Sequence, residues 1–391
     1  MKSFEFTGAI DSSKSLFNRA LMVQSHFPNF DVRGNSNCDD VRAMKKGIAN
    51  LLRKQPIDCG AAGTVLRFMA FRVARDKGEH ILTGTERLLS RPQSEIHYVL
   101  QQLGVSATTE KDGVHIKSEG WKKPMMPVVV RREDSSQFAS GLALSAWNLD
   151  WNLDFKFTGS LVSEPYWEMT HEFLRQLGMT IERKGDLWTI PAKQTLALKG
   201  YNVEPDYSSM ATIAILATLS GSASFTNHGA SSLQPDYAFT ELLKASGSQP
   251  LLQGNKITFK KVDSLRPQKI SMANNPDLFP SFAVLCSYAV GDSVLSDAPH
   301  LINKESNRIE KTAELLKKAG VKTWAVDGGL GIEGRGRDWT PRNFEFDPDQ
   351  DHRMAMAAGI YRFLNNGVRI TDPGVVDKSF PDFWKILGMA G

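Results

Sequence analysis

The sequence predicts an α+β protein built from repeated units, because one helix ending and one turn signal recur along the chain. An apolar pair followed a few residues later by a glycine recurs at intervals of roughly 70 residues, which is typical of a helix that stops in the left-handed conformation. These glycines are Gly104, Gly178, Gly247, Gly320 and Gly388. After four of them comes a hairpin turn, at Lys111-Asp112-Gly113, Lys184-Gly185-Asp186, Gln253-Gly254-Asn255 and Asp327-Gly328-Gly329. Units of this size are too large for a solenoid and indicate α+β subdomains that pack around shared helices.

The first unit departs from this pattern. A helix is expected from Val41 to Leu52, but it runs into Arg53-Lys54-Gln55-Pro56 without a glycine stop or a hairpin signal. Compared with the other units, about twenty residues are missing, which is the length of a hairpin. We therefore expect this subdomain to lack its peripheral hairpin while the Gly60–Arg67 loop and its helix remain. Lys45, Lys46, Arg53 and Lys54 would discourage pairing at the exposed edge.

The bulk composition is that of a globular protein with two or three domains. The chain has 391 residues, of which 41% are hydrophobic and 23% charged, and its net charge is +4. The three cysteines have no metal-ligand spacing, and the longest apolar stretch, near Met210 to Leu219, is too short to span a bilayer. The N-terminus has no apolar signal core. We expect a cytoplasmic monomer that binds neither membrane nor nucleic acid. Its net positive charge suits small anionic substrates.

Basic and hydroxyl residues cluster where helices are expected to begin. Asp351-His352-Arg353 opens a helix that is expected to run to Leu364. Since a helix N-terminus offers unpaired N–H groups, a cation beside it makes a natural anion site. Similar settings occur at Ser12–Arg19, Asp58–Arg67, Arg91-Pro92 (with Pro92 in a first helical turn), Ser135-Ser136-Gln137 (before a helix from Ala139 to Trp147), Asn275–Asp277 and Asn303–Arg308, where Lys304 and Arg308 would share a face if that segment is helical.

From Ser12 to Asp382 the chain resembles the 5-enolpyruvylshikimate-3-phosphate (EPSP) synthase family of the enolpyruvyl transferase superfamily. The most specific motifs are Asp351-His352-Arg353-Met354-Ala355-Met356, Lys378-Ser379-Phe380-Pro381-Asp382, Ser12-Ser13-Lys14-Ser15 with Arg19, and Gly63-Thr64 with Arg67. The resemblance implies two similar domains, each of three βαβαββ units, with the active site in the cleft between them. One domain would comprise residues 13–204, including the shortened first unit, and the other residues 1–12 plus 205–391.

The resemblance also implies the chemistry. The family transfers the enolpyruvyl group of phosphoenolpyruvate to the 5-hydroxyl of shikimate 3-phosphate and releases phosphate, a step toward chorismate and the aromatic amino acids. No metal or organic cofactor is expected. Carried over by motif, the residues that would bind shikimate 3-phosphate are Lys14, Ser15, Arg19, Ser135, Ser136, Gln137, Ser163, Asp277 and Lys304. Those that would bind phosphoenolpyruvate are Lys14, Gly63, Arg91, Gln137, Arg308, Arg353 and Lys378.

The implied catalytic residues are Asp277, Glu305 and Lys14. The reaction removes a proton from the hydroxyl and adds one at the methylene carbon, and two carboxylates in different surroundings can divide that work. Both substrates are polyanions, so burying them without cations would be prohibitive. The cations at the motif positions therefore give a physical reason for the basic clusters to converge.

Three other readings remain. The UDP-N-acetylglucosamine enolpyruvyl transferases are related, but they commonly carry a cysteine shortly before their Arg-Pro motif, and residues 84–90 contain none. A non-catalytic homologue would fit four departures from the usual family residues, namely Ser12, Ala61, His300 and Asn307. A nucleic-acid binder rests only on the mild positive charge and would show a steep salt dependence of binding.

Overall fold

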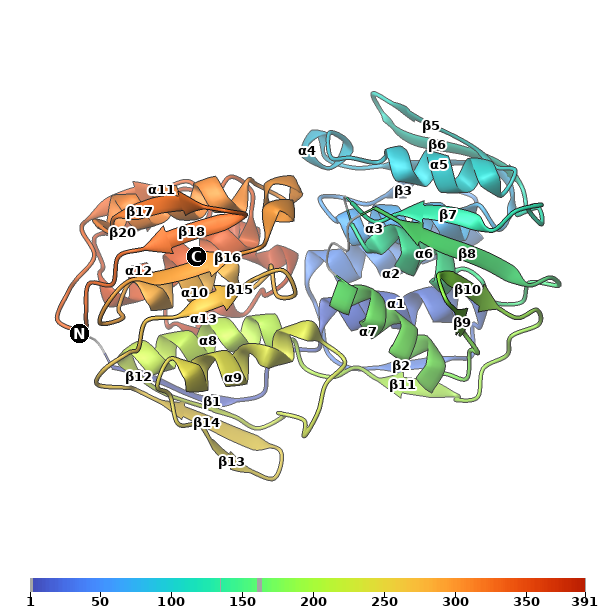
Figure 1. The fold of residues 1–391 in the computed structure, drawn as a ribbon. Helices are drawn as coiled ribbons and strands as arrows, with labels where there is room; N and C mark the ends of the chain where they lie inside the picture. Colours follow the sequence, from blue (N-terminus) through green and yellow to red (C-terminus); the bar gives the residue numbers. More distant parts are fainter. Residues whose placement is uncertain (1–2, 134, 160–163, 391) are drawn as a thin grey trace. The chain divides into compact units, whose positions relative to one another are not determined.

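The computed structural model describes residues 3–133, 135–159 and 164–390, and the chain divides into two compact units. One unit comprises Ser12–Glu204, and the other comprises Met1–Asp11 together with Pro205–Gly391. The first unit is therefore inserted after the N-terminal strand of the second. Figure 1 colours the chain along the sequence and labels most of the helices and strands of each unit. No helix in the described residues is long and apolar enough to cross a membrane.

The described residues of the unit Ser12–Glu204 form two four-stranded sheets and one two-stranded sheet. The first four-stranded sheet has the strand order β3-β4-β6-β5, the second β7-β8-β10-β9, and β2 pairs with β11 in parallel. The strands are β2 (Asp31–Arg33), β3 (Ile57–Asp58), β4 (Lys77–Thr83), β5 (Ser106–Glu110), β6 (Gly113–Glu119), β7 (Val128–Arg131), β8 (Leu153–Thr158), β9 (Glu182–Lys184), β10 (Leu187–Ile190) and β11 (Gly200–Asn202). The helices are α1 (Lys14–His26), α2 (Asp39–Leu52), α3 (Gly63–Val73), α4 (Glu86–Leu89), α5 (Ser94–Gln102), α6 (Gln137–Leu144) and α7 (Glu164–Gln176).

The second unit repeats this plan. Its four-stranded sheets have the orders β1-β12-β14-β13 and β15-β16-β18-β17, and β19 pairs with β20 in parallel. The strands are β1 (Phe4–Gly8), β12 (Gly221–Phe225), β13 (Leu251–Gln253), β14 (Lys256–Lys260), β15 (Lys269–Ser271), β16 (Ser293–Ser296), β17 (Thr323–Val326), β18 (Gly329–Ile332), β19 (Phe344–Phe346) and β20 (Val368–Ile370). The helices are α8 (Tyr207–Ser220), α9 (Phe239–Ala245), α10 (Phe279–Cys286), α11 (Arg308–Ala319), α12 (His352–Leu364) and α13 (Phe383–Ile386), with 3₁₀ turns η1 (Pro235–Ala238), η2 (Pro299–Asn303) and η3 (Pro373–Lys378).

Each unit is organised around three central helices. Each of these helices directly precedes a strand of a different sheet of that unit. In the second unit α8, α10 and α12 pack against one another, and nearly all of their residues are buried. A helix that is apolar all round fits only a position covered on every side. In the first unit α1, α3 and α6 are the equivalent helices. The amphipathic helices α2, α5, α7 and α11 instead bury one face.

The predicted glycine stops and hairpins are confirmed. All five repeat glycines are left-handed, with φ between 64° at Gly388 and 107° at Gly247. The hairpins that follow four of them are β5–β6, β9–β10, β13–β14 and β17–β18. An element order of βαβαββ with this strand pairing is complete in all four four-stranded sheets, as the resemblance implied.

The predicted loss of a hairpin from the first repeat, which contains β2 and α2, is also confirmed. Helix α2 ends at Leu52, Lys54 takes a left-handed φ of 56° without being a glycine, and β3 begins at Ile57. The described residues 53–56 thus leave no room for a hairpin, and the β2–β11 sheet has two strands. The β19–β20 sheet also has two strands, a second shortening that no pattern in the sequence indicated.

Several expected helix boundaries were wrong. Pro92 lies outside the helix, because α5 begins at Ser94 after Gln93 as its N-cap. Helix α6 spans Gln137–Leu144, two residues earlier at its start than expected and three shorter at its end. Lys304 has extended backbone at the end of η2, whereas Arg308 opens α11, so these two residues do not share a helical face.

Candidate active site

The predicted residues of the first unit gather at the starts of its central helices. Lys14 is the first residue of α1, whose N-cap Ser13 accepts a hydrogen bond from the Leu16 N–H. The Lys14 Nζ lies 3.0 Å from Asp40 Oδ2, and both side chains are buried. Because Asp40 comes from α2, this ion pair ties the start of α1 to the neighbouring helix.

Arg19 is a buried cation held by neutral groups. Its Nε donates to Thr170 Oγ1 at 2.8 Å, and its two terminal nitrogens donate to the carbonyls of Ser15 and Tyr166. Burial lowers the pKa of Arg19 to about 9. Since desolvation of the charge is not offset by a carboxylate among these three partners, an anionic ligand beside Arg19 would be stabilised.

The starts of α3 and α6 are joined by hydrogen bonds. The Gln137 Nε2 donates to Thr64 Oγ1 at 2.9 Å, and Arg67 Nη1 donates to Gln137 Oε1 at 2.9 Å. The Gln137 backbone N–H donates to Ser135 Oγ at 3.2 Å, and Ser136 is the buried N-cap of α6. Gly63 touches Arg91, because a Cβ placed on Gly63 would lie 2.9 Å from Arg91 Nη1. The structure therefore brings Gly63, Arg91 and Gln137 together.

In the second unit, Arg308 is surrounded by carboxylates. Its Nε donates to Asp351, its Nη1 to Asp277 at 2.7 Å, and its Nη2 to Glu305 and Asp351. Burial opposes the charge of Arg308, but these carboxylates, Asp351 foremost, raise its pKa above the ordinary value. These contacts use four of the five N–H donors of the guanidinium, which leaves one on Nη1 within the described contacts.

Asp277 is shared by two arginines. While its Oδ1 accepts from Arg308, its Oδ2 accepts from Arg353 Nη2 at 3.0 Å. The charges of Asp277, Asp206 and Asp236 raise the pKa of Arg353 against the opposing effect of burial. The two candidate catalytic carboxylates, Asp277 and Glu305, therefore meet on one guanidinium.

The remaining predicted residues are distributed as follows. Lys304 is half-buried between η2 and α11, and Lys378 is buried at the end of η3. His300 is buried in η2, and its pKa is lowered to about 3, first by burial and then by Lys304 and Arg308. Ser163 lies outside the described residues.

Four acidic or basic residues of these sites received no role from the sequence alone. Asp40 pairs with Lys14, Arg67 holds Gln137, and Asp351 holds Arg308. Asp236 in η1 accepts a hydrogen bond from Ser208 Oγ, and burial together with the nearby charge of Asp277 raises its pKa to about 7. Arg67 and Asp351 stand within the motifs quoted above, whereas no sequence signal marked Asp40 or Asp236.

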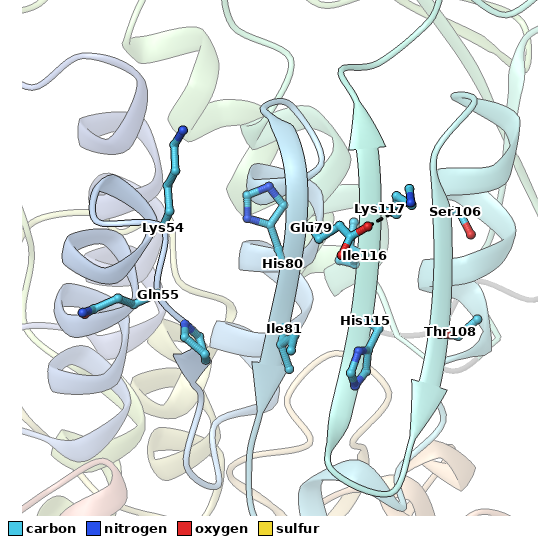
Figure 2. Close-up of a pocket in the computed structure, with 11 residues that line it drawn as sticks. Lys54, Gln55, Glu79, His80, Ile81, Ser106, Thr108, His115, Ile116 and Lys117 are labelled. Carbon is cyan, nitrogen blue, oxygen red and sulfur yellow. Dashed lines mark ion pairs between the residues drawn. The ribbon is translucent and has the colours of Figure 1, made fainter.

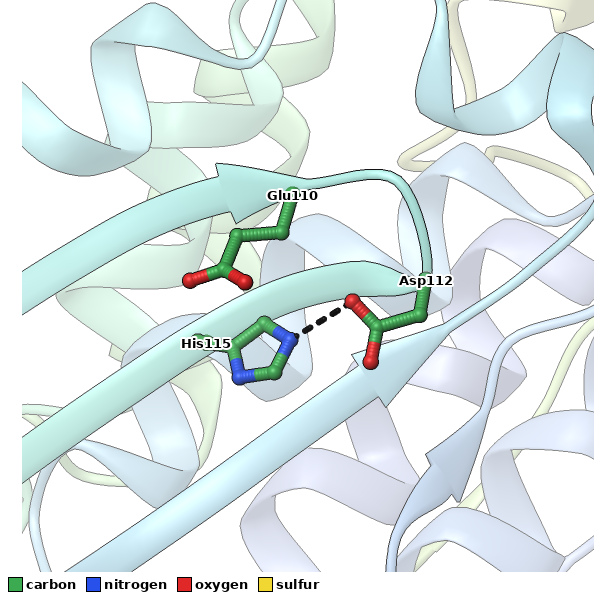
Figure 3. Close-up of side chains that lie close together, drawn as sticks. All are labelled: Glu110, Asp112 and His115. Carbon is green, nitrogen blue, oxygen red and sulfur yellow. Dashed lines mark hydrogen bonds and ion pairs between the residues drawn. The ribbon is translucent and has the colours of Figure 1, made fainter.

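Two other features of the first unit lie apart from the predicted residues. A cavity of about 410 Å³ on the sheet β3-β4-β6-β5 is lined by residues that include Lys54, His80, His115 and Lys117, none of which is a predicted site residue (Figure 2). At the β5–β6 turn, Glu110, Asp112 and His115 lie within reach of a common ion, but His115 Nε2 is already 2.8 Å from Asp112 Oδ1 (Figure 3).

Comparison with protein families gives one match that covers most of the chain. A model described as EPSP synthase (3-phosphoshikimate 1-carboxyvinyltransferase) matches residues 30–387. Among curated relatives, the 3-phosphoshikimate 1-carboxyvinyltransferase of Methanoculleus marisnigri is 29% identical over 338 residues, which is 85% of this chain and 78% of that protein. The enzyme of the same name from Pyrococcus abyssi is 31% identical over 84% of this chain and 77% of its own length. That of Bacteroides fragilis is 28% identical over 98% of this chain and 94% of its own.

Solved structures have the same fold. An EPSP synthase from Acinetobacter baumannii superimposes with a TM-score of 0.77 at 22% identity, covering 100% of this chain and 96% of that one. The enolpyruvyl transferase NikO from Streptomyces tendae gives a TM-score of 0.70 at 14% identity, covering 99% of this chain and 95% of that one. At these identities the likeness concerns the fold.

Proposed function

Because the chain belongs to the EPSP synthase family, we propose that it is a transferase that moves the enolpyruvyl group of phosphoenolpyruvate to the 5-hydroxyl of shikimate 3-phosphate. The observation that carries this proposal is the position of the predicted residues within each unit. Lys14, Gly63 and Gln137 are the first residues of α1, α3 and α6, and Arg353 is the second residue of α12. Helix N-termini with adjacent cations are suited to bind the phosphates and carboxylates of both substrates.

In the proposed reaction, the oxygen of the 5-hydroxyl forms a bond to the central carbon of phosphoenolpyruvate while its proton is removed. A proton is added at the methylene carbon, which becomes a methyl group. Phosphate then leaves the central carbon and one proton leaves the methyl carbon, which restores the double bond. Asp277 and Glu305 are the candidates for these transfers, since both are carboxylates beside the same cation. Lys14 and the arginines stabilise the phosphate as it departs.

The proposed binding roles fit the local chemistry. The three hydrogen-bond partners of Arg19 are neutral and do not balance its charge. This is consistent with a shikimate 3-phosphate site that also includes Ser15, Ser135, Ser136, Ser163 and Lys304. Arg91 against Gly63, the remaining N–H of Arg308 Nη1, and Arg353 with Lys378 are the proposed partners of phosphoenolpyruvate. We propose further that substrates bridge the two units, and that the protein acts as a cytoplasmic monomer.

Two of the four departures from the usual family residues, Asn307 and Ser12, have local hydrogen-bond partners. Asn307 is the N-cap of α11 and accepts from the Glu310 N–H, as an aspartate at this position would. The Ser12 hydroxyl donates to the Val203 carbonyl and accepts from the Asn35 N–H. These two substitutions are therefore compatible with an intact site, which favours the enzyme over a non-catalytic homologue.

The proposal is tested by phosphate release from phosphoenolpyruvate with shikimate 3-phosphate, with UDP-N-acetylglucosamine and with neither. We expect release only with shikimate 3-phosphate. Release driven by UDP-N-acetylglucosamine would assign the chain to the related activity, and calorimetric binding of both proposed substrates without release would identify a non-catalytic homologue.

A further inference from the structure

Arg67 is a buried arginine that links three segments of the first unit, its own helix included. It lies in the second turn of α3 and is 3% exposed, and its guanidinium carbon sits 4.8 Å from the centre of the Phe138 ring. Its Nη1 donates to Gln137 Oε1 at 2.9 Å, its Nη2 to the Pro92 carbonyl at 3.2 Å, and its Nε to Gln93 Oε1 at 3.5 Å. One side chain thus links α3 to the start of α6 and to the two residues after Arg91.

The first consequence concerns the amide of Gln137. An arginine can only donate hydrogen bonds, so the carbonyl oxygen of this amide must face Arg67 and its NH₂ group must face Thr64. One N–H of Gln137 Nε2 is used by Thr64 Oγ1, and no second acceptor is bonded to it within the described residues. In this orientation Gln137 presents an N–H donor, and an anionic oxygen is the group that such a donor binds best.

The second consequence concerns Arg91. Bonds to the Pro92 carbonyl and to Gln93 fix the chain directly after Arg91, and Gln93 Nε2 in turn donates to the Leu88 carbonyl in α4. Arg91 lies against the start of α3, at the position where a Cβ on Gly63 would meet its Nη1. Loosening this segment would therefore change the placement of the Arg91 charge.

We propose that Arg67 is a positioning residue for the anion site formed by Gly63, Arg91 and Gln137, because it sets the amide orientation of Gln137 and the placement of Arg91. This inference rests on the proposed function, since it concerns the same site. A positioning residue acts through its neighbours, so the effect of substituting it on kcat/KM should depend on whether those neighbours are present.

The test uses Arg67→Lys in the full-length enzyme. Lysine keeps the charge but loses the planar fork that reaches three acceptors. We expect kcat/KM for phosphoenolpyruvate to fall about 100-fold, because displacement of binding groups by about 1 Å has effects of that size. The matched control is Arg72→Lys in the same helix. Arg72 is also buried but bonds Ser25 and Asp76, so this variant should lose thermal stability without a change in KM.

A double-mutant cycle with Gln137→Ala identifies the route of the effect. If Arg67 acts through Gln137, Arg67→Lys should reduce kcat/KM for phosphoenolpyruvate less than tenfold when Gln137→Ala is already present. If Arg67→Lys does not fold, Thr64→Val replaces it, because it removes only the acceptor of the Gln137 amide. Thr64→Val should raise the KM for phosphoenolpyruvate several-fold, and its effect should vanish in the Gln137→Ala background.

Independent, multiplicative losses in these double variants would overturn the inference while leaving the proposed function intact. An Arg67→Lys enzyme with unchanged kinetics would do the same. A wild-type protein that shows no turnover of phosphoenolpyruvate with shikimate 3-phosphate would overturn the proposed function and the inference with it.

Discussion

Asp277 and Glu305 share Arg308, so the two carboxylates proposed for proton transfer are held a short distance apart by a cation. Asp277→Asn and Glu305→Gln keep the shape of each side chain and remove its negative charge. We expect each to lower kcat at least 100-fold while the Kd of shikimate 3-phosphate changes less than tenfold, because proton transfer contributes mainly in the transition state. Steady-state kinetics combined with calorimetry measures both quantities. Unchanged kcat in both variants would assign proton transfer to another group.

His300 gives a prediction for stability against pH. Burial and the charges of Lys304 and Arg308 lower its pKa from 6.5 to about 3, although Asp277 acts in the opposite direction. Between these values the unfolded chain binds a proton that the folded protein does not, so stability falls as pH decreases through this window. His300→Asn removes this effect, and it should lose about 2 kcal/mol less stability than the wild type between pH 7 and pH 5. Urea unfolding at both pH values measures this, and equal losses would contradict it.

At the level of single residues, the sequence indicated the cations and two of their acidic partners, Asp277 and Glu305, but not the ion pairs between them. Lys14, Arg308 and Arg353 stand in motifs with specific neighbours, so their places at helix starts could be read from the chain. Asp40 is 26 residues from Lys14, and Asp277 is 76 residues from Arg353. Such ion pairs depend on how helices pack, which short sequence patterns do not determine.

Helix α12 begins on a residue that joins three parts of the second unit. Asp351 caps α12 by accepting from the Arg353 N–H, and it also accepts from Arg308 and from Ser306 Oγ. Two left-handed residues, Asp349 and Gln350, turn the chain just before this cap. The start of α12 and the segment before α11 are therefore fixed by one buried carboxylate.

Asp351→Asn tests whether the Asp351 carboxylate fixes the start of α12 against the segment before α11. Asparagine can still cap the helix, so the change isolates the lost charge beside Arg308. We expect a loss of about 3–5 kcal/mol in the free energy of unfolding, because one partner of a buried ion pair is removed. The control is Glu310→Gln, an exposed acid in the first turn of α11, which should cost less than about 0.5 kcal/mol. Chemical denaturation that gave the same small loss for both variants would contradict the assigned role.

The helix endings and hairpins were predictable because they depend on local chemistry. A left-handed residue after a helix favours glycine, and short hairpin turns need glycine or asparagine, so each repeat marks its own boundaries. Lys54 shows the limit of this rule, since it takes the left-handed conformation with a side chain. The shortened first repeat could still be identified from the sequence, because its helix runs directly into the next strand.

Across the whole molecule, the proposed substrate contacts come from two separate units. Lys14, Arg91 and Gln137 belong to one, and Lys304, Arg308 and Arg353 to the other. A ligand that contacts both units favours the arrangement in which they approach each other. We expect the radius of gyration from small-angle scattering to decrease when shikimate 3-phosphate and phosphoenolpyruvate are both added, and less with either alone. An unchanged radius of gyration at saturating ligand would contradict bridging.

The transfer itself is tested most directly by following the carbon of phosphoenolpyruvate into product. The enzyme is incubated with ¹³C-labelled phosphoenolpyruvate and shikimate 3-phosphate, and the products are identified by NMR and mass spectrometry. We expect the labelled carbons to appear as an enol ether on the shikimate ring, in amounts equal to the phosphate released, and Asp277→Asn to form this product far more slowly. Label that remains in phosphoenolpyruvate, or that appears only as pyruvate, would contradict the proposed transfer.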